Sequence, residues 1–165
     1  MKLKSMCIAL AIFFICCGLS ITFAYADNKG GPNQSEVSGV VSSISGSTIT
    51  VLNGNMDIDA STAYVKVDGC SGSFNVNNIE DGDIIDAKGT VSNGVFVANK
   101  IEIKGIGKLE GVITSVNSGS ITILGQTIDI TSPYCTSGTL SAGKKAKVYV
   151  RDSGSGLTAI SIKAK

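Results

Sequence analysis

Residues 39–60 read GVVSSISGSTITVLNGNMDIDA, and residues 111–132 read GVITSVNSGSITILGQTIDITS. The two segments align without a gap at a shift of 72 residues, with 8 identities in 22 positions. Both contain short alternating runs of Val, Ile and Thr separated by glycine-containing turn signals, which is typical of antiparallel β-hairpins. This duplication predicts a chain built from two copies of one small β-unit.

A second, weaker match extends the duplication to the last residue. Residues 82–104 align with residues 143–165 at a shift of 61, so the first copy carries 11 more residues, which we place within residues 63–81. We therefore expect two repeats, at 36–105 and 107–165, each with about five or six short strands. Closing such strands into a barrel removes exposed edges. The predicted fold is all-β, with two tandem small antiparallel β-barrels after an N-terminal signal peptide.

Strand alternation also predicts which side chains fill each barrel. Apolar residues that recur at every second position of a strand should point inward. The predicted core of the first barrel is Val40, Ile44, Ile49, Val51, Ile58, Ile85, Phe96 and Ile101, with Val112, Val116, Ile121, Ile123, Ile130 and Ile162 in the second.

The N-terminus has the features of an export signal. Two lysines precede 18 uncharged residues at 7–24, and residues 24–26 (Ala-Tyr-Ala) match the small-x-small site of signal peptidase. We expect a signal peptide at 1–26, cleaved after Ala26, and a periplasmic or secreted protein; retention as a membrane anchor is the alternative. Residues 27–35 should form a flexible spacer. No later stretch approaches 18 apolar residues, so no transmembrane helix is expected after cleavage.

The repeated pattern resembles a known family. Its elements are Gly-Val-Val-x-x-Ile at 39–44, Thr-Ile-Thr-Val at 48–51, Asp-Ile-Asp at 57–59, Asp-Gly-Asp-x-Ile at 81–85 and Ala-x-Lys-Ile-Glu at 98–102. This cycle is similar to an exported bacterial family of β-barrel repeats that is catalogued as a domain of unknown function. The resemblance implies an OB-like fold and the cell envelope, and it carries no catalytic residues. The second repeat departs from the pattern at Ala142-Gly143-Lys144.

The composition argues for a folded protein without catalytic chemistry. Hydrophobic residues make up 43% and charged residues 16%, which excludes a disordered chain. The chain has no His, the commonest general base and transition-metal ligand. We predict neither an enzyme nor a cofactor. An acidic group of Glu80, Asp81, Asp83 and Asp86 lacks the spacing of a calcium loop, so we predict a solvated turn there and no metal site.

Two cysteines, Cys70 and Cys135, lie outside the signal peptide. Export to an oxidising compartment favours a disulfide between them, and without His they cannot complete a Cys/His zinc site. Each lies in its own repeat, so a bond requires the barrels to dock with these two loops adjacent. Two free thiols are the alternative.

One strand of the second repeat is basic. Alternation places Lys145, Lys147 and Arg151 on one face together with Tyr149. This face is our candidate ligand-binding site for an anionic polysaccharide or a lipid head group, with a plain solvated face as the alternative. An OB-like barrel could also bind single-stranded nucleic acid there, but export and the scarcity of aromatic residues argue against it.

The charges of the two repeats are opposite. Residues 36–106 hold nine acidic side chains and four lysines, whereas residues 107–165 hold three acidic and seven basic side chains. Such asymmetry favours docking of the repeats within a chain or head-to-tail self-association between chains, unless both charged faces point to water. The linker 104–108 contains two glycines and permits close docking without enforcing it.

These observations predict a class of function. We expect an exported, non-enzymatic envelope protein that acts as a structural or protein-interaction β-barrel module. The alternative is a binding protein for an anionic polysaccharide or lipid head group, through the basic strand of the second repeat. The partner would be an envelope protein or an anionic polymer.

Overall fold

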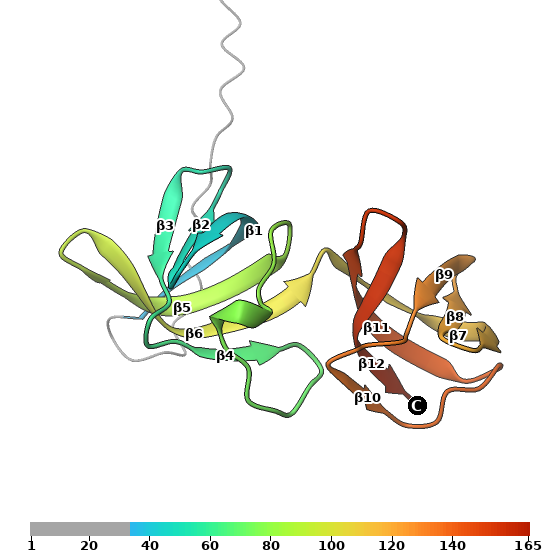
Figure 1. Cartoon of the computed structure of the whole chain (residues 1–165). Helices are drawn as coiled ribbons and strands as arrows, with labels where there is room; N and C mark the ends of the chain where they lie inside the picture. Colours follow the sequence, from blue (N-terminus) through green and yellow to red (C-terminus); the bar gives the residue numbers. More distant parts are fainter. Residues whose placement is uncertain (1–33) are drawn as a thin grey trace, which may run out of the picture.

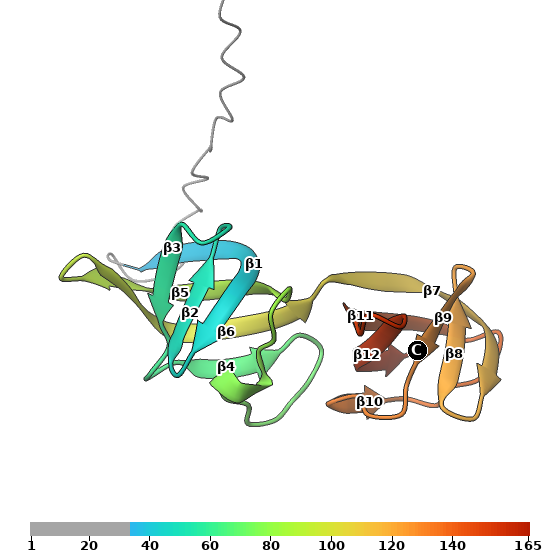
Figure 2. The same ribbon diagram turned by 45° about the horizontal axis from the view of Figure 1, so that its top comes forward.

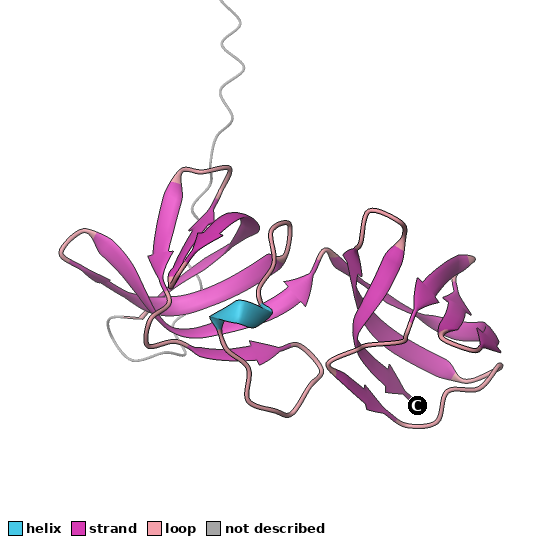
Figure 3. Cartoon of the chain, viewed as in Figure 1, coloured by secondary structure: helices cyan, strands magenta, loops and turns pink. Residues whose placement is uncertain are grey.

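The computed structural model describes residues 34–165 and consists almost entirely of β-strands. The predicted signal peptide and most of the predicted spacer lie outside these residues. Figure 1 shows two barrels side by side, and Figure 3 shows one short helical turn among the strands. The first barrel contains β1 (Ser35–Ser45), β2 (Thr48–Val51), β3 (Met56–Asp59), β4 (Tyr64–Val67), η1 (Val76–Asn78), β5 (Ile84–Ser92) and β6 (Val95–Gly105). The second contains β7 (Gly107–Asn117), β8 (Ser120–Ile123), β9 (Gln126–Asp129), β10 (Cys135–Ser137), β11 (Lys145–Asp152) and β12 (Leu157–Ala164).

The two barrels have the same strand order. In the first, β3-β2-β1-β5-β6 form a sheet that closes through a parallel pairing of β3 with β6. In the second, β9-β8-β7-β11-β12 close through β9 and β12. A further strand, β4 or β10, pairs parallel with the last strand of each barrel, as can be followed in Figure 2. The predicted fold, two tandem small OB-like β-barrels, is confirmed, and five strands close each barrel.

The two repeats correspond less simply than the ungapped alignment suggested. The turn between β2 and β3 spans residues 52–55, whereas Leu124 and Gly125, both at positive φ, form a two-residue turn between β8 and β9. Beyond β8 the alignment is therefore wrong by two residues. The true counterpart of Ile58 is Ile128, since each pairs with a buried Ile of the preceding strand and is itself fully buried. Ile130, the predicted counterpart, only packs against the edge of the core.

The predicted cores are correct except at Ile130 and in the first strand of each barrel. Val40, Val112 and Val116 are 48%, 44% and 40% exposed, whereas Val41 and Ile113 are buried. A β-bulge follows Val41 in β1 and Ile113 in β7. Its extra residue shifts the phase of the alternation within each strand, so Val40 and Val112, which precede it, point outward. The other predicted core residues are buried in the core clusters (Ile49, Val51, Ile58, Ile85, Phe96, Ile101, Ile121, Ile123 and Ile162) or, like Ile44 and Ile130, packed against them.

The connection between the barrels is shorter than the predicted linker. Strand β6 ends at Gly105 and β7 begins at Gly107, so Ile106 alone lies between them. The Ile106 N–H donates to the carbonyl of Val150 at 2.8 Å. Gly105 has φ +63° and packs so closely that an added Cβ would lie 2.2 Å from the same carbonyl oxygen. The connection is therefore anchored to β11 of the second barrel.

This packing predicts different responses to alanine at two neighbouring glycines. Gly105→Ala should lower the free energy of unfolding by about 2–3 kcal/mol, because it combines positive φ with a backbone clash. Gly107→Ala is the control, since nothing lies within 4 Å of its added Cβ, and it should change stability by less than about 0.5 kcal/mol. Urea titration measures both; equal losses would contradict the close approach at Gly105.

Candidate functional site

The first barrel contacts the second largely through a connection that is longer in the first repeat than in the second. Residues 68–83 connect β4 to β5, whereas the shorter segment 138–144 connects β10 to β11. The longer connection carries η1 and lies between the two barrels in Figure 1, where it is drawn in green. This longer connection, which we call the insertion, supplies Cys70, Phe74, Asn78 and Glu80 to the contact with the second barrel.

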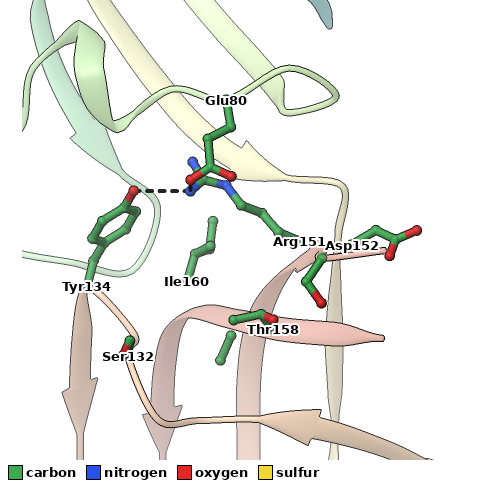
Figure 4. Close-up of a pocket in the computed structure, with 9 residues that line it drawn as sticks. Glu80, Ser132, Tyr134, Arg151, Asp152, Thr158 and Ile160 are labelled. Carbon is green, nitrogen blue, oxygen red and sulfur yellow. Dashed lines mark hydrogen bonds and ion pairs between the residues drawn. The ribbon is translucent and has the colours of Figure 1, made fainter. Parts of the chain in front are cut away.

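Arg151 of β11 is at the centre of this contact. Its guanidinium donates to both carboxylate oxygens of Asp83, from Nε at 2.8 Å and from Nη2 at 2.6 Å. Nη2 also donates to the carbonyl of Asn78 at 2.6 Å, and Nη1 donates to the carboxylate of Glu80 and, at 3.0 Å, to the hydroxyl of Tyr134, as Figure 4 shows in part. These contacts use all five N–H donors of the arginine.

Asp83 is held in position for this pairing. It is 1% exposed, and its Oδ2 accepts from the N–H of Glu80 at 2.9 Å. Burial alone would lower the pKa of Arg151, but hydrogen bonds with Asp83 and Tyr134 raise it above its usual range. The prediction of a solvated acidic turn is therefore wrong for Asp83, which is buried because the arginine of the other barrel covers it. Lys144 at the matching position of the second repeat was the sequence signal for this difference.

Aromatic and apolar side chains surround the ion pair. The ring of Tyr134 lies edge-on to that of Phe74, with 5.5 Å between centroids, and its hydroxyl donates to the carbonyl of Asn78 at 3.2 Å. Tyr149 and Ile160 of the second barrel are buried in the core cluster of the first. The contact therefore continues the apolar interior of the first barrel into the second.

A disulfide joins the barrels at the same contact. Cys70 of the insertion is bonded to Cys135 of β10, with 5.7 Å between their Cα atoms. Close by, the Ser161 hydroxyl donates to the carbonyl of Asp68 at 2.6 Å. Disulfides of this kind are typical of proteins that fold outside the cytosol.

The predicted ligand-binding strand is only partly available to a ligand. Lys145, Lys147, Tyr149 and Arg151 share the outward face of β11, but Tyr149 and Arg151 are buried beneath the first barrel. Burial, and then a hydrogen bond with Asp68, raises the pKa of Tyr149 above its usual range. The ammonium of Lys147 lies 4.7 Å from the centroid of the Tyr149 ring. Two of the four candidate residues thus form the barrel contact.

A cavity of about 200 Å³ opens beside Arg151. Ser132, Thr158 and Ile160 line it together with Glu80 and Tyr134 (Figure 4). Because the N–H groups of Arg151 are engaged, the polar side-chain groups left to this cavity are hydroxyls and the carboxylates of Glu80 and Asp152. Within residues 34–165, no three His, Cys, Asp or Glu side chains are grouped so that they could hold a metal ion. No helix in the described part of the chain is long and apolar enough to cross a membrane.

The fold and its contact define a class of protein, a pair of OB-like barrels locked together as tandem repeats. Residues 38–102 and 110–163 match the DUF5666 family, described as a domain of unknown function. These regions cover more than half of the chain, which therefore belongs to this family.

The chain is also similar to solved structures. The fimbrial biogenesis protein PilY2 of Pseudomonas aeruginosa PAO1 is 18% identical, over 45% of this chain and 81% of that chain, with a TM-score of 0.36. The Drosophila Unr CSD456 chain is 15% identical, over 79% of this chain and 61% of that chain, with a TM-score of 0.33. No curated protein matches the sequence.

The buried ion pair predicts a large effect of removing its cation. Arg151→Ala should lower the free energy of unfolding by about 3–5 kcal/mol, because it leaves Asp83 buried without its partner. The control is Lys108→Ala, which breaks the exposed pair of Lys108 with Glu110, 3.8 Å apart, and should cost less than about 1 kcal/mol. Chemical denaturation measures both, and an Arg151→Ala loss no larger than the control would refute the central role of the pair.

The disulfide predicts a loss that depends on redox conditions. Replacing Cys70 and Cys135 by serine should lower the free energy of unfolding by about 2–4 kcal/mol, because the bond closes a long loop of the unfolded chain. Reductant should lower the stability of the unsubstituted protein by a similar amount and leave the double variant unchanged. Alkylation of both thiols in the exported protein without reductant would show that the bond does not form.

Proposed function

We propose that this protein is an exported, non-enzymatic module of the cell envelope whose two barrels act as one rigid body and present fixed surfaces to a protein partner. The observation that carries this proposal is the saturated arginine contact. Every N–H of Arg151 is bonded within the chain, so this buried cation between the barrels serves to fix their orientation. A group committed in this way does not bind or activate a substrate.

The type of contact favours a mechanical role. A covalent bond between Cys70 and Cys135, a buried ion pair and a shared apolar core all join the same two surfaces. Rigidity of this kind reduces the conformational entropy lost when a partner binds across both barrels. We therefore expect the partner to contact both barrels at once.

Export brings the protein into an oxidising compartment, in which the disulfide can form. We expect the mature chain to begin at Asp27 and to be recovered from the periplasmic or secreted fraction. N-terminal sequencing of the protein from that fraction checks both expectations. Recovery of the uncleaved chain in the membrane fraction would favour the retained anchor.

A cross-linking experiment tests the rigid-module proposal. The tagged protein is cross-linked in intact cells, purified at about 1 M salt to screen charge interactions, and the retained proteins are identified by mass spectrometry. An unlocked variant combines Arg151→Ala with serine at Cys70 and Cys135, and Lys108→Ala is the matched surface control.

We expect the control to retain the same protein partner as the unsubstituted chain, and the unlocked variant to retain at least about tenfold less, equivalent to about 1.4 kcal/mol. Circular dichroism establishes that both barrels of the unlocked variant remain folded. Equal retention by a folded unlocked variant, or retention of a polymer without any protein, would overturn the proposal.

A further inference from the structure

The outward sheet surface of the second barrel carries five lysines, which we call the lysine face: Lys108 of β7, Lys145 and Lys147 of β11, Lys163 of β12 and Lys165 directly after it. Lys147 is paired across the sheet with Lys163, and the N–H of Lys165 donates to the carbonyl of Lys145 at 2.9 Å. Like charges placed directly opposite one another destabilise a sheet. Lys147 and Lys163 therefore repel one another across the sheet.

The first barrel shows how the same surface looks when its charges are balanced. In the first barrel, Asp86 of β5 is paired with Glu102 of β6. The matching pair in the second barrel is Lys147 of β11 with Lys163 of β12. Likewise, Glu36 of β1 faces β5 in the first barrel. At the matching position of the second barrel, Lys108 of β7 faces β11. Three acidic positions of the first barrel are thus lysines in the second.

Each of these three acidic residues is neutralised by a lysine neighbour. Lys88 lies 3.3 Å from Glu36, Lys66 lies 2.7 Å from Glu102, and Lys104 pairs with Asp86. No such balance exists on the lysine face.

Glu110 is the one acidic residue that the described strands β7, β11 and β12 place on the lysine face. It lies 3.1 Å from Lys165 and 3.8 Å from Lys108. A hydrogen bond from Lys165 and the charges of the surrounding lysines lower the pKa of Glu110. Its charge is therefore shared among several lysines, and Lys147 and Lys163 have no carboxylate partner among the described residues.

We propose that the lysine face binds a linear polymer that carries phosphate groups. Lysine binds phosphate as a compact point charge. Arg151, whose planar fork would match carboxylate and phosphate alike, is already engaged in the barrel contact. Side chains along a strand are about 7 Å apart on one face, and neighbouring strands are about 5 Å apart. One phosphate can reach only one or two of these lysines, so the whole face is used only by a ligand with phosphates in series.

Other anionic partners fit the face less well. Tyr149, the aromatic side chain of this strand, is buried, so bases cannot stack on it as they do on proteins that bind single-stranded nucleic acid. Val112, opposite Lys145, is the one large apolar side chain exposed among the lysines of these described strands. An interfacial membrane surface needs a broader apolar face than this.

Fluorescence anisotropy with labelled long-chain inorganic polyphosphate tests the proposal. The key variant combines Lys147→Asp with Lys163→Glu, which are the residues that the first barrel carries at these positions. The matched control combines Lys88→Glu with Lys100→Glu, another directly paired lysine couple on the first barrel. Both double variants change the net charge equally.

We expect the unsubstituted protein to bind polyphosphate with an affinity that falls as salt increases. The Lys147/Lys163 variant should bind at least about tenfold more weakly, and the Lys88/Lys100 control within about twofold of the unsubstituted protein. Equal losses in the two variants would show that net charge alone is responsible and would overturn the site.

Two further probes distinguish other sources of negative charge. Equal or tighter binding of polygalacturonate, which carries carboxylates, would overturn the assignment to phosphate. Binding of anionic lipid vesicles in the absence of polyphosphate binding would indicate a membrane surface instead. The outcome is independent of the rigid-module proposal, since the Lys147/Lys163 variant should still retain the protein partner at high salt.

Discussion

The bidentate pair between Arg151 and Asp83 is the interaction on which the arrangement of the two barrels depends. A buried ion pair is a poor source of net stability, because desolvating both charges offsets most of their attraction. The pair is nevertheless directional, since the planar guanidinium donates its hydrogen bonds in one fixed geometry. The apolar contacts of Tyr149 and Ile160 supply the stabilising burial, and the ion pair selects one orientation from the several that an apolar contact alone would allow.

Much of the fold could be predicted from the sequence, because a barrel built from hairpins is encoded locally. Alternation and turn residues were sufficient to locate the strands and most of the core, including Ile49, Ile58 and Ile101. The errors arose where a single extra residue changes the register. A bulge after Val41 turned Val40 outward, and a shorter turn at Leu124 moved the buried position from Ile130 to Ile128. Neither the bulge nor the shorter turn changes the hydrophobic pattern of the sequence.

The contact between the barrels was the least predictable part. The opposite charges of the repeats and the two cysteines indicated that the halves attract one another, but not which side chains meet. Asp83 looked like one member of an exposed acidic turn, and Arg151 like one member of a basic strand. Each took its role from a residue about 70 positions away in sequence, a distance that no local pattern reports. The longer connection at 68–83 was a sequence feature that pointed to the contact, since residues present in only one of two copies indicate a role specific to that copy.

The unequal division of the contact has a consequence for assembly. The same backbone turn presents Asp83 in the first repeat and Lys144 in the second, because Gly82 and Gly143 bond to equivalent strands. Conversely, the position that Arg151 occupies in β11, opposite Thr158, is occupied in β5 by Thr90, opposite Val97. The first repeat therefore carries only the aspartate of the contact, and the second repeat carries only the arginine. Docking through the Arg151–Asp83 contact therefore stops at two barrels. Identical repeats could have docked head to tail into an open-ended fibre, whereas these two repeats form a closed pair.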